Sequence, residues 1–345
     1  MPQKSFIHDK KNDQKYCISG YKVSNREPED ETLRKDFSDH IKVSAKELPP
    51  KVDLRPLMTT VENQNPMNTC LGNAFAGALE YLLKKQNNGS DIDVSRLFIY
   101  YNARLIQEEI TKEKVTNIDD GASISYGLEA LKKFGVCNES IWKYDKGIVN
   151  KRPSNEAYEA AKSRTIYDTL KIKTDLAEMK QCLAQGLPFV FGLIVFKSFD
   201  KHHGSGIVPM PTPEEVKKEK PGGHGMLAVG YSDYSKAFIV RNSWGTTWGD
   251  KGYAFIPYDY MTDPKYCFES CAFRLTDDDD LGHEDWDQDD SIDLHPDTVD
   301  EEEDNDDDYE IIEEEIEVIE ETEEEQEQEQ EGEGKQEDQN NQGNE

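Results

Sequence analysis

The distribution of charge along the chain is the feature that most limits how it can fold. Residues 277–345 contain 36 aspartates and glutamates and one basic residue, Lys335, for a net charge of −35. Because the whole chain of 345 residues carries −32 at pH 7, residues 1–276 carry +3. A self-repelling segment that is poor in aromatic side chains buries too little apolar surface to fold. We therefore expect residues 277–345 to be a disordered acidic tail.

The acidic tail has three interpretations. It can act as a solubilising segment, as an electrostatic tether for basic proteins, or as a competitor for proteins that bind nucleic acids. Its charge should repel nucleic acids and anionic membranes, so neither is an expected partner. Three isoleucines in the tail, Ile312, Ile316 and Ile319, recur at helical spacing. Residues 309–321 could therefore form an amphipathic helix on a partner, or they could add to a sheet as a strand.

The segment before the tail divides into an N-terminal extension and a globular domain. Residues 1–49 are polar and irregular, and Pro49-Pro50 marks the boundary, so we place the domain at residues 50–276. Apolar residues recur every three or four positions after Cys70, from Val94 to Leu105 and from Ile124 to Phe134. This spacing predicts three helices in a helical lobe over about residues 60–165.

The second half of the domain has the composition of strands. Its apolar runs are short and separated by turn residues, at Phe189 to Phe196, Met226 to Tyr231, Ala237 to Val240 and Tyr253 to Ile256. Such runs predict an antiparallel, barrel-like lobe over about residues 166–276. The domain is therefore expected to have an α+β fold.

Three residues of the domain carry the chemistry. Cys70 lies at the start of a predicted helix, where the helix dipole favours the thiolate that acts as a nucleophile. His224 lies in a glycine-rich context, and Asn242 follows a predicted buried strand. An asparagine oxygen can accept one imidazole N–H and so fix the tautomer and orientation of the histidine. Together the three residues predict a nucleophile, its base and the group that orients the base.

These motifs resemble those of the papain family. The resemblance rests on Val61 to Gln64, Cys70, Gly222 to Gly225 and Asn242 to Gly245, and it extends over roughly residues 50–276. It implies a two-lobed fold and a cysteine endopeptidase that forms an acyl-enzyme intermediate. It also implies that Gln64 completes the oxyanion hole and that Trp244 shields the hydrogen bond between the histidine and the asparagine.

The resemblance extends to substrate binding. Gly121 resembles a residue whose backbone pairs with an extended peptide, and Gly225 resembles a residue that lines the main specificity pocket. A glycine at position 225 should leave room for a bulky apolar side chain. Residues 1–49 lack the long helical pattern of the family's inhibitory segments, so the sequence does not indicate autoinhibition.

The residues around Cys70 depart from the family signature. Met67, Thr69 and Leu71 stand where a cysteine, a small residue and an aromatic residue are usual, so two of the three positions are changed. These changes resemble a compact branch found among microbes and large DNA viruses. Two alternatives stay open. The chain could be an inactive papain-like scaffold or binding module, or the same triad could catalyse deconjugation of ubiquitin-like proteins or transpeptidation.

Cysteine usage and the N-terminus bear on location. The six cysteines lack the regular spacing of a disulfide scaffold, and residues 1–17 contain no apolar segment of a signal peptide. No stretch is long and apolar enough to span a membrane. We therefore expect a monomer in the cytoplasm, or in a virion or host-cell cytoplasm. It should act on a peptide or protein substrate without a metal or other cofactor.

Overall fold

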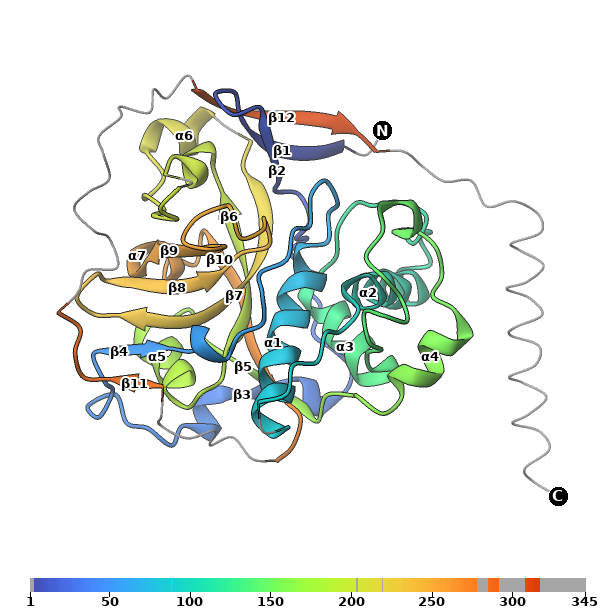
Figure 1. Ribbon diagram of the computed structural model, residues 1–345, viewed down its shortest axis with the longest axis horizontal. Helices are drawn as coiled ribbons and strands as arrows, with labels where there is room; N and C mark the ends of the chain where they lie inside the picture. The colour runs from blue at the N-terminus through green and yellow to red at the C-terminus, as the bar shows by residue number, and fades with distance from the viewer. Residues whose placement is uncertain are drawn as a thin grey trace.

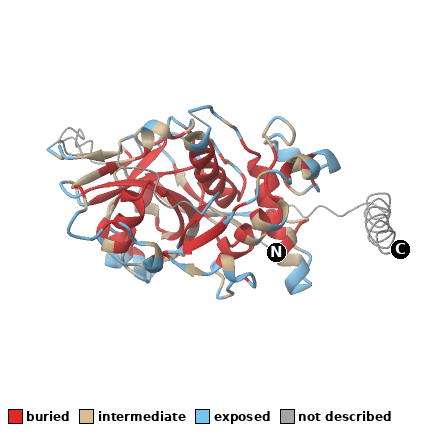
Figure 2. Ribbon diagram, turned by 90° about the horizontal axis from the view of Figure 1, so that it is seen from below, coloured by how far each residue is buried: buried red, intermediate tan, exposed pale blue. Residues whose placement is uncertain are grey.

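The computed structural model describes residues 3–87, 89–202, 204–218, 220–277, 285–291 and 308–316. The described residues form a helical lobe and a strand lobe that lie side by side (Figure 1). The predicted α+β fold is confirmed, although the described strands do not close into a barrel. Buried residues gather in the strands and in the helix faces turned toward them (Figure 2).

The helical lobe contains α1 (Cys70–Gln86), α2 (Arg96–Thr111), α3 (Ile124–Phe134) and α4 (Asn155–Ala161). The three helices predicted from apolar spacing correspond to α1, α2 and α3. Helix α3 ends at Gly135, whose φ of +71° is a conformation that glycine adopts without strain. Helix α1 packs against both α2 and the strand lobe, so it forms the wall between the two lobes.

A nine-stranded sheet forms the strand lobe. Its strands are β3 (Lys35–Asp36), β4 (Lys51–Asp53), β5 (Asp168–Lys171), β6 (Phe189–Val195), β7 (Gly222–Ser232), β8 (Ala237–Arg241), β9 (Tyr253–Pro257), β10 (Cys267–Arg274) and β11 (Trp286–Asp287). The order is β11-β4-β7-β6-β10-β5-β3, with β8 paired to β7 and β9 paired to β8. All neighbours are antiparallel except β3 and β5. The four predicted strands correspond to β6, β7, β8 and β9.

Short helices complete this part of the fold. The α-helices are α5 (Leu176–Ala184), α6 (Pro213–Lys218) and α7 (Tyr258–Met261). The 3-10 helices are η1 (Glu31–Leu33), η2 (Phe37–His40), η3 (Arg55–Leu57), η4 (Lys146–Ile148) and η5 (Lys197–Asp200). Within the described ranges, no helix combines the length and the apolar composition needed to cross a membrane.

A second, three-stranded sheet combines two strands of the N-terminal extension with one strand of the acidic tail. It consists of β1 (Gln3–Asp9), β2 (Gln14–Cys17) and β12 (Tyr309–Glu315), in the order β12-β1-β2, and it lies at the top of Figure 1. We call β1 and β2 together the hairpin. Strand β12 belongs to the acidic tail.

The tail therefore differs from expectation in two places. Strand β11 pairs with β4 and β12 pairs with β1, so these two segments are ordered. Of the two forms open to residues 309–321, a helix on a partner and a strand added to a sheet, the structure shows the strand for 309–315, because the open edge of β1 offers backbone partners along the whole segment. Residues 317–321 lie outside the described residues.

A buried ion pair between β5 and β10 tests this fold. Arg274 donates to both carboxylate oxygens of Asp168, at 2.8 and 2.6 Å, and the two side chains are 2% and 0% exposed. Asp168→Ala would leave the guanidinium buried without this partner, so we expect the free energy of unfolding to fall by about 3–5 kcal/mol. Guanidinium chloride denaturation measures this change.

The matched control is Asp287→Ala, which removes a more exposed carboxylate that pairs with Lys51 at 3.3 Å. Such a pair contributes below about 1 kcal/mol. Equal losses of unfolding free energy in Asp168→Ala and Asp287→Ala would contradict the special role of the buried pair.

Candidate active site

Cys70 lies where the two lobes meet. It is the first residue of α1 and is fully buried. Its Sγ accepts a hydrogen bond from the backbone N–H of Gly225 in β7, at 3.3 Å. Gly225 directly follows His224, so this contact joins Cys70 of the helical lobe to the segment of the strand lobe that carries His224.

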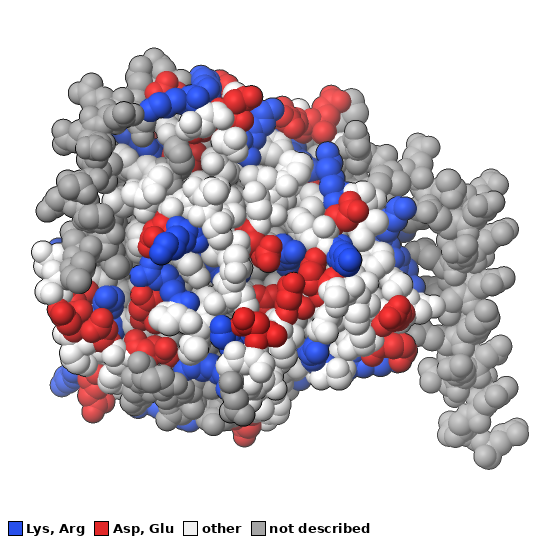
Figure 3. Space-filling model, in the orientation of Figure 1, with Lys and Arg blue, Asp and Glu red and all other residues white. Residues whose placement is uncertain are grey.

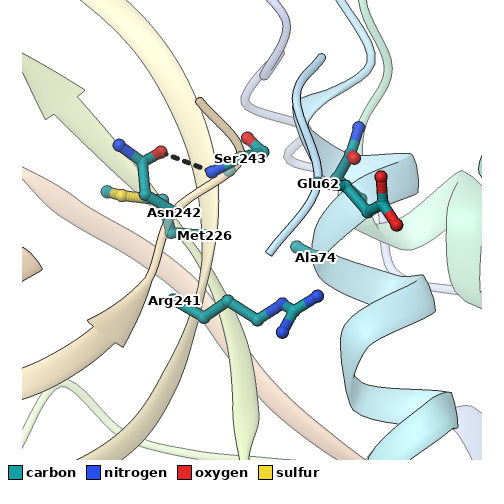
Figure 4. Close-up of a pocket in the computed structure, with 8 residues that line it drawn as sticks. Glu62, Ala74, Met226, Arg241, Asn242 and Ser243 are labelled. Atoms are coloured by element: carbon teal, nitrogen blue, oxygen red, sulfur yellow. Dashed lines mark hydrogen bonds between the residues drawn. The ribbon is translucent and has the colours of Figure 1, made fainter. Parts of the chain in front are cut away.

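His224 and Asn242 are joined by a hydrogen bond. Nε2 of His224 lies 2.8 Å from Oδ1 of Asn242. The same oxygen accepts the backbone N–H of Ser243, also at 2.8 Å (Figure 4). Two contacts to one oxygen fix the orientation of the amide, so Nε2 is the donor of the imidazole. The other nitrogen, Nδ1, is buried and has no hydrogen-bond partner among the described residues. In the neutral ring Nδ1 is therefore an unoccupied proton acceptor.

Trp244 covers the pair of His224 and Asn242. Its ring lies 5.1 Å from the imidazole, centroid to centroid, and it is buried. Tyr16 of β2 stacks on the indole of Trp244, with ring centroids 4.7 Å apart. The indole therefore lies next to the imidazole, and the hairpin adds a second aromatic layer above it. That it shields the hydrogen bond between His224 and Asn242 stays a prediction.

Gln64 is held by the loops on either side of the site. Its Nε2 donates to the carbonyl oxygen of Met67 at 2.9 Å, which uses one of the two amide hydrogens. Its Oε1 accepts from the hydroxyl of Ser243, and its backbone N–H donates to the Ser243 carbonyl at 2.8 Å. The structure thus ties the loop before Cys70 to the loop after Asn242.

A segment of the N-terminal extension runs through the site. We call residues 18–22 the strap. The N–H of Tyr21 donates to Gly223 of β7 at 3.0 Å, and the N–H of Lys22 donates to Ala122 at 2.9 Å. In return, the N–H of Ala122 donates to the carbonyl of Gly20 at 2.9 Å. The strap is therefore paired by its backbone to both walls of the cleft.

Gly20 of the strap covers the thiol. A Cβ atom at position 20 would lie 2.7 Å from Cys70 Sγ and 2.6 Å from the Asn68 carbonyl oxygen. Gly121 has a φ of +101°, and a Cβ there would lie 2.6 Å from the Gly20 carbonyl oxygen. Gly121 therefore lies against the chain's own strap, and the binding of a substrate peptide there stays a prediction.

Tyr21 fills a side-chain slot that sequence reasoning missed. A Cβ at Gly192 would lie 2.1 Å from atoms of the Tyr21 ring, so this glycine opens the slot. At its end, the Tyr21 hydroxyl donates to Oε2 of Glu269 at 2.7 Å. By contrast, a Cβ at Gly225 would lie 2.4 Å from Leu71, so Leu71 takes up the room expected there.

The electrostatics of the covered site favour neutral groups. Burial raises the pKa of the Cys70 thiol to about 12, although the N–H of Gly225 opposes the shift. Burial also lowers the pKa of His224 to about 4, although the hydrogen bond with Asn242 opposes it. While the strap lies over the site, thiol and imidazole are both uncharged at neutral pH.

A small cavity of about 10 Å³ lies behind the site, between α1 and the ends of β7 and β8 (Figure 4). Its lining includes Asn73, Arg241 and Asn242. Two buried amide atoms of this lining, Asn73 Oδ1 and Asn242 Nδ2, have no hydrogen-bond partner in the described part of the chain. The volume and the polar lining suit one water molecule. Among the described residues, no three histidine, cysteine or acidic side chains gather as metal ligands.

Comparisons with known proteins agree with this geometry. Residues 48–267 match the papain family cysteine proteases. An uncharacterised peptidase C1-like protein of Acanthamoeba polyphaga mimivirus is 37% identical over 226 residues, which cover 61% of this chain and 70% of that protein. Xylellain, a cysteine protease from Xylella fastidiosa, is 32% identical, with a TM-score of 0.60 over 74% of this chain and 100% of its own.

A more distant structure shows the likeness of fold alone. The digestive procathepsin L 3 of Tenebrio molitor is 19% identical, with a TM-score of 0.56 over 73% of this chain and 76% of its own. The match to the family spans well over half of the chain and contains all three residues of the predicted triad. The chain therefore belongs to the papain family and is a cysteine peptidase, a hydrolase.

Proposed function

We propose that the protein hydrolyses peptide bonds through Cys70, His224 and Asn242. The observation that carries the proposal is the imidazole of His224. One of its nitrogens is bound to Asn242, and the other has no hydrogen-bond partner among the residues that the structure describes. This imidazole belongs to β7, the strand whose Gly225 contacts the Cys70 thiol. A base held in one tautomer beside a thiol is the arrangement that activates a nucleophile.

The reaction has two steps. His224 takes the thiol proton, and the Cys70 sulfur forms a bond to the scissile carbonyl carbon. The peptide C–N bond then breaks as His224 returns the proton to the leaving amine, which leaves a thioester on Cys70. In the second step a water molecule gives a proton to His224 and attacks the thioester, which releases the carboxylic acid and restores the thiol. The Gln64 amide and the Cys70 N–H are the proposed donors to the oxyanion of each tetrahedral intermediate.

The strap makes this structure a latent form. With Gly20 against the thiol and both walls of the cleft paired to residues 18–22, a substrate backbone has no place to bind. The covered groups are also uncharged, which removes the thiolate. We propose that the strap must leave the cleft before catalysis.

The slot filled by Tyr21 suggests which substrate side chains the enzyme prefers. It is walled by a glycine at position 192 and ends at the carboxylate of Glu269, which also lines a cavity of about 200 Å³ between α3 and β10. We propose that the slot takes a long side chain with a terminal hydrogen-bond donor, such as tyrosine, lysine or arginine.

The state of the cysteines bears on the compartment. All six lie within the described residues, where they are buried and free. We propose that the protein works in a reducing compartment such as the cytoplasm.

The first prediction concerns the triad and is made in a Gly20→Val background, where the strap should be displaced. We expect Cys70→Ala and His224→Ala to lower kcat/KM for a fluorogenic peptide by at least about 10³-fold, because each removes a reacting group. Gln64→Ala should lose about 10²-fold to 10³-fold, as expected for one oxyanion donor.

Cys137→Ala is the matched control for the triad, since Cys137 is buried in a separate cluster of the helical lobe. It should leave kcat/KM unchanged. If the folded Gly20→Val protein cleaves no peptide and binds no epoxide inhibitor at Cys70, the chain is instead an inactive scaffold.

The second prediction follows from the pKa of Cys70. In the wild type the alkylation rate of Cys70 by iodoacetamide should be slow and should still be rising at pH 10, because burial raises the thiol pKa to about 12. In Gly20→Val the added side chain clashes with Cys70 and Asn68. The thiol can then form an ion pair with His224, and the rate should level off near neutral pH.

Gly204→Val is the control, because a Cβ at position 204 meets no atom within 4 Å. It should keep the wild-type pH profile, as followed by mapping the alkylated peptide with mass spectrometry. Identical profiles for wild type and Gly20→Val would show that the strap does not shield the thiol.

The third prediction concerns Glu269. In the Gly20→Val background, Glu269→Gln removes the negative charge at the end of the slot. It should lower kcat/KM for peptides with arginine or lysine at the position that fills the slot by about tenfold to a hundredfold. Peptides with phenylalanine there should be affected little. A positional peptide library measures both, and an equal loss for all side chains would contradict the assignment of the slot.

A further inference from the structure

Strand β12 of the acidic tail pairs with the whole length of β1. The antiparallel register runs from Gln3 opposite Glu315 to Asp9 opposite Tyr309. The N–H of Lys10 extends it by donating to the Asp308 carbonyl at 2.9 Å. All seven residues of β12, four of which are glutamates, are therefore paired with residues of β1.

The pairing continues without a break into the active site. Strand β1 pairs with β2 on its other side, and the N–H of Ile18 donates to the Ser5 carbonyl at 2.9 Å. Ile18 is the first residue of the strap. The tail strand, the hairpin and the strap are therefore one hydrogen-bonded unit, with β12 on its outer edge (Figure 1).

Ion pairs reinforce the contact of β12 with the hairpin. Lys10 lies 3.2 Å from Glu310 and Lys15 lies 2.6 Å from Glu314, and all four side chains are between 42% and 46% exposed. His8 also approaches Glu310, at 3.1 Å. Basic and acidic side chains alternate over this upper edge of the molecule (Figure 3). Since the pairs are half-exposed, each is weak and open to competition from solvent.

Apolar contacts fasten β12 to the rest of the fold. Tyr309 at its start and Ile316 just after its end are buried, at 6% and 7% exposure. The strand also contacts η5, which belongs to the connection between β6 and β7. The tail strand thus connects the hairpin to the lobe that carries His224.

We propose that β12 is a releasable latch, which holds the hairpin and thereby keeps the strap over Cys70. Only one consequence rests on the proposed function, namely that release of β12 would permit catalysis. The latch itself is a statement about the exchange of one edge strand. Its contacts to β1 are backbone pairs at a sheet edge and half-exposed ion pairs, which are the contacts that open at the lowest free energy.

The test measures hydrogen exchange of the strap in the full-length chain. It uses a Cys70→Ala background, so that self-cleavage cannot contribute. The reporting amides are those of Tyr21 and Lys22, which are bonded to Gly223 and Ala122. In Glu310→Lys/Glu314→Lys two attractive pairs become repulsive, and we expect exchange at these amides to accelerate on the order of tenfold. Amides in β7 at the centre of the sheet should keep their wild-type rates.

Two matched variants control for charge. Glu323→Lys/Glu325→Lys changes the net charge of the tail equally, outside β12, and should leave exchange of the strap unchanged. Adding Lys10→Glu/Lys15→Glu to the β12 variant restores opposite charges across the pairs, and should restore slow exchange. Wild-type exchange in Glu310→Lys/Glu314→Lys, or equal acceleration in the Glu323→Lys/Glu325→Lys control, would overturn the proposal.

A second pair of variants tests the backbone contact independently of lysine and glutamate pairing. Because Lys10 and Asp308 form a hydrogen-bonded pair, alternation directs the N–H of Ile312 toward β1 and that of Glu313 away from it. Ile312→Pro should therefore accelerate exchange of the strap, whereas Glu313→Pro should change it little. Equal rates in the two proline variants would also overturn the latch.

Exchange separates this proposal from the proposed function. If the strap is released by the β12 variants but no variant cleaves a peptide, the latch stands and the peptidase mechanism fails. If the Gly20→Val enzyme is active but the β12 variants exchange like the wild type, the mechanism stands and the latch fails.

Discussion

The packing of α1 against β7 is the contact on which the remainder of the structure depends. It joins the lobes at Gly225, whose N–H bonds to Cys70 and whose missing side chain leaves room for Leu71. In α1, Gly77 lets Arg241 of β8 approach the helix, since a Cβ at position 77 would lie 2.9 Å from Nε of Arg241. Without this approach the nucleophile and its base would belong to separate surfaces.

The same burial that brings the groups together suppresses their chemistry. A thiol with a pKa of about 12 and an imidazole with a pKa of about 4 are both neutral over the physiological range. Ionisation of the pair requires solvent or a substrate in place of the strap. We therefore expect control of this enzyme to lie in the contacts of residues 18–22 and of the hairpin next to them, more than in the proposed triad.

Much of the catalytic frame could be predicted from the sequence, because it is encoded locally. The spacing of apolar residues gave α1, α2 and α3, and the contexts of His224 and Asn242 identified side chains that the structure joins at 2.8 Å. Gln64 and Trp244 also lie beside these residues, as expected from the resemblance to the papain family.

The features that escaped prediction depend on distant pairings. Gly20 and Tyr21 lie in a polar segment with no periodicity, and only the fold brings them to Cys70 and Glu269. Glu269 reaches the slot from an irregular part of β10, where its φ is +53°. For residues 309–315 the sequence left a helix on a partner and an added strand open, and only the open edge of β1 decides between them.

The most direct test of the account is labelling of Cys70 by an epoxide inhibitor, followed by peptide mapping with mass spectrometry. In the wild type Gly20 lies against the thiol, whereas a Cβ at position 20 would lie 2.7 Å from Cys70 Sγ and 2.6 Å from the Asn68 carbonyl oxygen. Cys70 should therefore stay unlabelled in the wild type and become labelled in Gly20→Val. If Cys70 is labelled equally fast in the two proteins, the strap does not occupy the catalytic cleft.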